Sequence, residues 1–215
     1  MTRSYRQYCG LARALDVVGD RWNLLIVRQL LLGPARNREL MDGLPGVAPN
    51  LLADRLRNLE AAGVIERRPA PVGNFIVYAL TPWGAQLRGP IDELIRWSTP
   101  LMTSGPGDDP FLPDWLAVAV PALLNPAPIA ESATPVVGLD INGQIFDLRI
   151  TNDGPTIARH DGHTLDATLR ADPTIILGLA AGVIGIDDVR DAIEVDGDEG
   201  ALRTVFARRL ETTQT

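Results

Sequence analysis

The sequence contains no lysine, one cysteine and two histidines among its 215 residues, and only 5% of the residues are aromatic. The single cysteine, Cys9, excludes a disulfide within the chain. No apolar run approaches the roughly 18 residues that a membrane-spanning helix needs. The start of the chain lacks the apolar core and cleavage site of a signal peptide, so the sequence predicts a cytoplasmic protein with no membrane partner.

Because lysine is absent, all 20 basic residues are arginine, and their distribution is uneven. Residues 1–100 carry 13 arginines against 9 acidic residues, a net charge of +4. Residues 101–215 carry 7 arginines against 18 acidic residues, a net charge of −11, which brings the chain to −7. An apolar content of 46% excludes a disordered chain. The sequence therefore predicts two parts that have different partners.

A cluster of Gly, Pro and Asp in "TSGPGDDPFLPD", residues 103–114, predicts a linker between the two parts. The first part shows helical patterns that are separated by turn residues and one basic β-hairpin. The predicted helices are 9–18, 21–32, 36–43, 49–62 and 82–101, and the predicted strands of the hairpin are 64–69 and 74–80.

The second part predicts an α+β module, so the fold class of the whole chain is α+β. Val137, Leu139 and Ile141 alternate along one predicted strand, and Asn142-Gly143 forms the hairpin turn into the next. Asp172 precedes Pro173 as the N-cap of an apolar helix. The predicted helices are 114–125, 172–182 and 198–210, and the predicted strands are 135–142, 144–151, 156–161, 166–171 and 192–197.

The helix predicted over 49–62 combines an apolar stripe with a polar face. Its leucines recur at helical spacing, whereas Asn50, Asp54 and Arg57 point away from them. Arginine pairs with guanine edges or phosphates and asparagine pairs with adenine, so this face suits the major groove of DNA. Asp54 would repel phosphate, and two roles remain open for it: accepting from cytosine or holding Arg57 in place.

The elements around this helix extend the basic surface. A short turn joins it to the helix before, as in a helix-turn-helix, and the hairpin after it would contact a second phosphate group as a wing does. The alternative is a solvated amphipathic helix with ordinary surface arginines; the combination of helix, turn, helix and basic hairpin favours DNA binding. The candidate DNA-binding residues are Arg36, Arg38, Pro49, Asn50, Asp54, Arg55, Arg57, Asn58, Arg67 and Arg68.

Residues 1–103 closely resemble the HxlR family of winged helix-turn-helix regulators, relatives of the MarR type. The resemblance rests on the early cysteine, on "GDRW", on "LPGVAPNLL" at the start of the recognition helix and on "YALTPWG" at the end of the wing. It implies a transcriptional regulator, and a homodimer that binds a near-palindromic operator in double-stranded DNA. Residues 9–18 and 82–101 would form the dimer contact. Ala48 departs from the family, where Ser or Thr commonly caps this helix.

Two roles are open for Cys9, which stands where some members of the family carry a redox-sensing thiol. Arg6 or Arg13 would have to lower the pKa of the thiol for it to react. With one cysteine per chain, oxidation would end in a bridge between subunits or in a mixed adduct. The alternative is a small residue that packs in the dimer interface.

Residues 114–210 resemble the sterol carrier protein type 2 like domain, through a strand, an Asp-Pro helix, a short helix, "VDGD" and a final helix. The resemblance implies a domain that binds a small apolar ligand in a tunnel. The alternative is that the same apolar residues form only the core of a small sheet domain. The candidate ligand-binding residues are Trp115, Leu139, Ile141, Phe146, Leu148, Ile176, Leu179, Val183 and Phe206.

Both histidines lie in "RHDGH", at positions 160 and 163. Together with Asp161 they could form a metal or acid–base site. Asp161-Gly162 marks a turn, however, which predicts that both imidazoles lie in solvent, and the sequence shows no other cluster of ligands, so no metal site is predicted. The sequence contains no nucleophile elbow, phosphate loop or dinucleotide motif, so it predicts neither an enzyme nor a cofactor. The resulting hypothesis is a dimeric regulator, a repressor, whose operator affinity is modulated by an apolar ligand. The alternatives are a redox switch through Cys9, with the second domain as a scaffold, or a lipid carrier.

Overall fold

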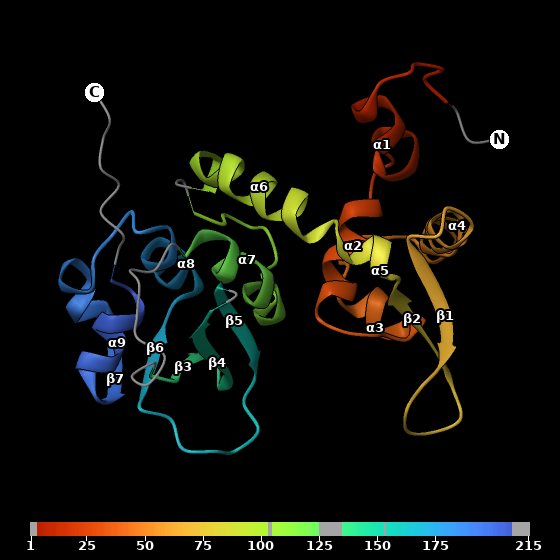
Figure 1. The fold of residues 1–215 in the computed structure, drawn as a ribbon. Helices are drawn as coiled ribbons and strands as arrows, with labels where there is room; N and C mark the ends of the chain where they lie inside the picture. The colour runs from red at the N-terminus through yellow and green to blue at the C-terminus, as the bar shows by residue number, and fades with distance from the viewer. Residues whose placement is uncertain (1–3, 103–104, 125–134, 153, 208–215) are drawn as a thin grey trace. The chain divides into compact units, whose positions relative to one another are not determined.

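The computed structural model describes residues 4–102, 105–124, 135–152 and 154–207. The chain forms two compact units, Met1–Ile91 and Asp92–Thr215. Both units contain helices and strands, which confirms the mixed α+β class (Figure 1). Within the described residues, no helix has the length and apolar character required to span a membrane.

The first unit consists of short helices and one two-stranded antiparallel hairpin. In the hairpin, Ile65 lies opposite Leu80 and Arg67 lies opposite Tyr78. The elements are α1 (Gly10–Val18), α2 (Asn23–Leu31), α3 (Asn37–Asp42), α4 (Pro49–Ala61), β1 (Ile65–Pro69), β2 (Ile76–Leu80) and α5 (Pro82–Ala85), and α6 (Arg88–Ser98) continues into the second unit.

The predicted single helix over 82–101 is wrong, because the segment forms α5, α6 and the 3-10 helix η1 (Thr99–Met102). Pro90 has no backbone N–H with which to bond the carbonyl of Gln86, so one continuous ladder of hydrogen bonds cannot form there. Thr81 caps α5, since its hydroxyl accepts from the Gly84 backbone N–H at 3.0 Å.

The turn from α4 into the hairpin is fixed by backbone geometry. Gly63 has a φ of +75°, a conformation that glycine adopts without steric cost. The N–H of Val64 then donates to the carbonyl of Leu59 at 2.9 Å. β1 therefore starts directly after α4, and the hairpin is held close to the C-terminal end of that helix.

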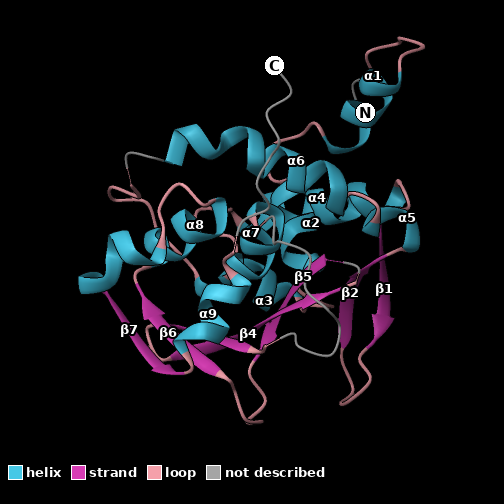
Figure 2. Ribbon diagram, turned by 60° about the vertical axis from the view of Figure 1, so that its left-hand side comes forward, coloured by secondary structure: helices cyan, strands magenta, loops and turns pink. Residues whose placement is uncertain are grey.

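The second unit is a five-stranded sheet with the order β5-β4-β3-β6-β7, in which only β3 and β6 are parallel neighbours. Helices α7, α8 and α9 lie on one side of this sheet (Figure 2). The elements are η2 (Pro113–Trp115), α7 (Leu116–Leu123), β3 (Val137–Ile141), β4 (Gln144–Thr151), β5 (Gly154–Arg159), β6 (Ala167–Ala171), α8 (Pro173–Ala181), η4 (Ile186–Ala192), β7 (Ile193–Gly197) and α9 (Glu199–Val205).

The predicted hairpin of the second unit is confirmed. Asn142 and Gly143 both have positive φ angles, 53° and 83°, as the tight turn between β3 and β4 requires. Leu139 lies opposite Phe146, and both are buried against the helices. Asp172 caps α8 as predicted, because its carboxylate accepts from the Thr174 N–H at 2.8 Å. The end of the last predicted helix, 208–210, lies outside the described residues.

Candidate nucleic-acid interface and ligand pocket

Helix α4 has the two faces that its sequence predicts. Leu52, Leu56 and Leu59 are fully buried in the first unit. The other side of the helix is exposed, so its polar groups are available to a partner. Pro49, Asn50, Asp54, Arg57, Asn58 and Ala61 form this exposed face. No side chain caps the helix at Ala48, although Pro49 occupies its first position.

Asp54 and Arg57 form an ion pair one turn apart on the exposed face. The side chain of Arg57 nevertheless stays 70% exposed. This contact corresponds to the second of the two roles considered for Asp54, in which the carboxylate orients the guanidinium.

Arg55 differs from the other candidate residues of α4, because its side chain is only 19% exposed. Its guanidinium is 2.7 Å from the Asp20 carboxylate and donates to the Arg21 carbonyl at 3.2 Å. Arg55 therefore ties α4 to the segment between α1 and α2. The sequence predicts that Arg55 lies beside the DNA-facing residues. In the structure its side chain instead contacts Asp20 and Arg21 of the same unit.

The arginines around α4 are exposed, and Arg36, Arg67 and Arg68 have local partners. Arg36 lies at the N-cap of α3, and its guanidinium stacks over the Phe75 ring at 3.5 Å. Arg38, the second residue of α3, is exposed. In the hairpin, Arg67 binds Glu60 at 2.9 Å, a hydrogen bond that raises the pKa of Arg67. Arg68 lies 3.8 Å from Glu66.

Helix α1 exposes an apolar surface. Tyr8, Leu11 and Leu15 are exposed, and Cys9 is an exposed free thiol at the N-cap of this helix. Arg13 lies 3.8 Å from Asp16, its ion-pair partner. Exposed apolar side chains also mark α6 and the 3-10 helix after it, namely Leu94, Trp97, Leu101 and Met102.

A surface pocket of about 450 Å³ lies between α8, η4 and α9 of the second unit. Three of the candidate ligand-binding residues line it: Leu179, Val183 and Phe206. Ile184 and Ile186 add further apolar lining. The other candidates are packed in or beside the sheet core rather than along this pocket, and they are Trp115, Leu139, Ile141, Phe146, Leu148 and Ile176.

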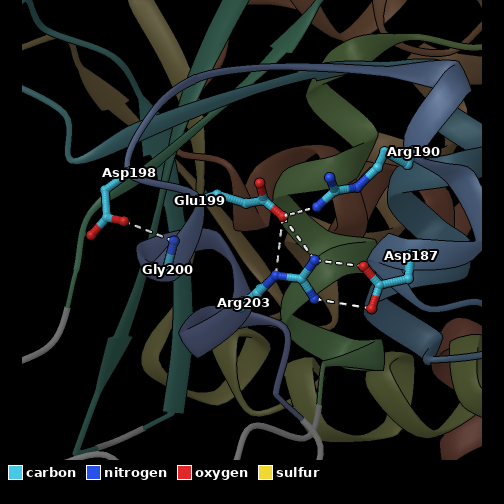
Figure 3. A network of polar contacts seen from close by, with 6 residues as sticks. All are labelled: Asp187, Arg190, Asp198, Glu199, Gly200 and Arg203. Carbon is cyan, nitrogen blue, oxygen red and sulfur yellow. Dashed lines mark hydrogen bonds and ion pairs between the residues drawn. The ribbon is translucent and has the colours of Figure 1, made fainter.

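The rim of the pocket carries a network of charged groups (Figure 3). Arg203 binds Asp187 at 2.5 Å and Glu199 at 2.7 Å. Arg190 binds the same Glu199 oxygen at 2.6 Å. The hydrogen bond from Arg203 lowers the pKa of Asp187. The network ties α9 to η4, which keeps the two walls of the pocket together.

The prediction that both histidines lie in solvent is wrong. The side chains of His160 and His163 are 20% and 32% exposed, and both face the buried carboxylate of Asp147. The turn at Asp161-Gly162 folds the histidines back onto β4 rather than away from it. Sequence reasoning missed Asp147, although its position between Phe146 and Leu148 places it on the sheet face opposite the core.

Comparison with known proteins identifies the first part of the chain. A family model described as "HxlR-like helix-turn-helix" matches residues 17–105. The HTH-type transcriptional regulator YodB of Bacillus subtilis (strain 168) is 34% identical over 86 residues, which are 40% of this chain and 77% of that protein. The uncharacterized HTH-type regulator YvaP of the same organism is 38% identical over 88 residues, 40% of this chain and 82% of that protein.

One solved structure is also similar to part of this chain. The crystal structure of quinone-bound YodB from B. subtilis is 32% identical, with a TM-score of 0.37. The likeness covers 41% of this chain and 93% of the chain in that crystal. The family model leaves residues 106–215 unmatched, so the resemblance of the second part to sterol carrier protein type 2 stays a prediction.

Proposed function

Because the chain belongs to the HxlR-like helix-turn-helix family, we propose that it is a dimeric, cytoplasmic repressor that binds a near-palindromic operator. The observation that carries the proposal is the exposed polar face of α4, opposite three fully buried leucines. The buried stripe holds the helix rigidly in the unit, so Asn50, Arg57 and Asn58 are presented on a fixed scaffold. We assign the chain no catalytic role.

In this mechanism α4 enters the major groove and the hairpin follows the backbone. Asn50, at the N-terminal end of the helix, and Arg57, about two turns later, contact base edges. Arg36, Arg38, Arg67 and Arg68 neutralise phosphates on either side, which sets the register but not the sequence. Two copies would place their recognition helices roughly 34–36 Å apart, in successive major grooves on one side of the DNA.

Selection from a pool of random duplexes tests the DNA-binding proposal. The intact protein should enrich an inverted repeat whose half-sites are about one helical turn, roughly 10 base pairs, apart. A pool that shows no enriched sequence after repeated rounds at low salt would overturn the proposal. Enrichment of an unpaired single site would retain DNA binding but contradict the dimeric mode.

The second unit supplies the regulatory input in this proposal. The pocket between α8, η4 and α9 has apolar walls and a charged rim, which suits a small, mainly apolar ligand with one polar group. Such a ligand changes operator affinity only if it prefers one of two states of the dimer. The charge of −11 in residues 101–215 would repel phosphate and so favour an arrangement in which this unit lies away from the DNA.

Native mass spectrometry of the purified dimer, followed by denaturing extraction, tests the ligand. One apolar molecule per chain that also releases the protein from its selected duplex would support the proposal. A molecule that binds without any change in DNA affinity would indicate a carrier instead.

A redox input through Cys9 is the second candidate, favoured by one observation: the thiol is exposed at the start of α1, beside exposed apolar residues. An oxidant or electrophile would then modify the thiol within the expected dimer contact. The Cys9→Ser variant distinguishes a redox input through Cys9 from a ligand input through the second unit. If the variant still loses DNA affinity on treatment with peroxide or a quinone, Cys9 is not the sensor.

A further inference from the structure

Two buried aspartates lie on the face of the second sheet that is opposite the helices. Asp140 on β3 and Asp147 on β4 are each 4% exposed at the side chain. A buried carboxylate is costly unless a positive or hydrogen-bonding group compensates its charge. Asp140 has such a partner, because the Arg170 Nε donates to its Oδ2 at 2.9 Å. The buried charge of Asp147 has two histidines as its neighbours instead.

Asp147 faces two imidazoles, which are the only two of the chain. The His160 Nδ1 is 2.7 Å from Oδ1, and the His163 Nε2 is 3.4 Å from Oδ2. The ring centroids are 5.0 Å apart, and one ligand atom from each of the three residues lies within 4.8 Å of the other two. The backbone supports this arrangement, since the His160 N–H donates to the Ile145 carbonyl at 3.0 Å beyond the end of β5.

The tautomer of His163 is set by a fourth residue. Asp161 accepts a hydrogen bond from the Nδ1 of His163 at 2.6 Å. With its proton on Nδ1, neutral His163 directs the Nε2 lone pair toward Asp147. A carboxylate behind a histidine whose other nitrogen faces inward is the arrangement that orients metal-binding histidines.

From this geometry we propose that Asp147, His160 and His163 bind a divalent transition-metal ion of the zinc class. Two imidazole nitrogens and one carboxylate oxygen are donors that zinc accepts, and solvent would complete a tetrahedral site. The ion also supplies the positive charge that the buried Asp147 requires. Asp161 is a positioning residue, because it acts through His163.

Arg149 is the internal competitor for this site. Its Nη2 is 2.8 Å from the Nε2 of His163, so the guanidinium occupies the lone pair that the ion would take. Arg149 is exposed and can turn toward solvent when the ion binds. If the proposal is correct, removal of the Arg149 guanidinium should tighten zinc binding.

Zinc titration of the intact protein by calorimetry tests the site, with imidazole NMR as a second readout. A Cys9→Ser background removes the one thiol that would compete for the metal. We expect one zinc per chain and shifts of both histidine spin systems, which are free of overlap because the chain has no other histidine. His163→Gln should abolish binding, and Asp161→Asn should weaken it about 10-fold.

Arg149→Gln should tighten binding severalfold, because it removes a competing donor and a nearby positive charge. Asp108→Asn, an exposed acid in a turn, serves as the matched control and should leave binding unchanged. Circular dichroism checks that each variant is folded. Absence of saturable binding at millimolar zinc, or binding that persists in His163→Gln, would overturn the proposal. Neither result bears on DNA binding, which is measured separately.

Discussion

Several exposed arginines of the first unit have weak, local partners. Arg57 pairs with Asp54, Arg67 pairs with Glu60, and Arg36 stacks on Phe75. Exposed ion pairs of this kind contribute about 0–1 kcal/mol. The side chains are therefore oriented in the free protein, and exchange of these partners for phosphates or base edges would cost little free energy in the proposed complex.

Asp54→Ala separates the two roles of this residue. If Asp54 only orients Arg57, the variant should bind all duplexes more tightly, because a negative charge leaves the interface, and should discriminate less between them. Affinity for the selected operator and for an unrelated duplex, measured at one salt concentration, checks this. A loss of selectivity confined to one C·G position, with no gain on unrelated DNA, would instead identify Asp54 as a base-reading residue.

At the residue scale, the local sequence pattern predicts which side chains are exposed, but it does not predict contacts between residues far apart in the chain. Periodicity suffices for Asn50 and Arg57, whose exposure depends only on the helix that carries them. Arg55 lies on the same helix, but its partners are 34 and 35 residues away, and no local pattern encodes that contact. The histidine cluster likewise depends on the pairing of β4 with β5, which brings Asp147 to residues 13 and 16 positions later.

At the element scale, the segment "TPWG" links the wing to α5 through close packing. A side chain at Gly84 would overlap the carbonyl oxygen of Val64, where β1 is about to begin. The hydroxyl of Thr81 also donates to the Gly63 carbonyl at 2.7 Å. These contacts fix the base of the hairpin against the end of α4.

Gly84→Ala should therefore destabilise the protein by about 1–3 kcal/mol, through overpacking. Gly89→Ala is the matched control, since a Cβ there meets nothing within 4 Å. The control should be neutral or stabilising by up to about 1 kcal/mol, because glycine disfavours helices. Urea denaturation gives both values. Equal stability of the two variants would contradict the close approach of α5 to β1.

The network at the pocket rim predicts a dependence of stability on pH. The hydrogen bond from Arg203 lowers the folded-state pKa of Asp187 from its usual 3.8, so the stabilisation is present above that pH and is lost as pH falls through the lower folded value. The stability difference between the wild type and Asp187→Asn should be complete at about pH 6 and should shrink as the pH falls below 3.8 and through the lower folded pKa. Thermal melts across this range measure it. A difference that persists at the acidic end would mean that charge is not its source.

The ends of helices and strands could be predicted from the sequence where turn and capping residues mark them clearly. Gly63, Asn142-Gly143 and Asp172-Pro173 fixed a helix end, a hairpin turn and a helix start, and the structure has all three. The long helix predicted over 82–101 failed because apolar periodicity continues across Gln86, while the hydrogen-bond ladder does not. The pocket could not be predicted from the sequence, because its walls come from three separate elements, α8, η4 and α9.

At the scale of the whole molecule, the proposed function requires a dimer, because two recognition helices are needed to bind both half-sites of an inverted repeat. The exposed Leu11 and Leu15 of α1 are the side chains that we expect a second copy to cover. Light scattering of the intact protein should give twice the 23.2 kDa mass of one chain. Leu11→Arg should shift the protein toward monomer and weaken operator binding together. A monomeric wild type, or a Leu11→Arg variant that remains fully dimeric, would contradict this contact.

The most direct test of the account is the affinity of the intact protein for its selected duplex when α4 loses its polar groups. Asn50→Ala with Arg57→Ala is compared with Arg159→Ala, another exposed arginine that pairs with an acid, in the second unit and outside the pocket rim. Fluorescence anisotropy should show a loss of about 1–3 kcal/mol for each base contact removed from α4. Arg159→Ala should match the wild type. Unchanged affinity in the α4 variant would contradict the account, because its exposed face would then not read DNA.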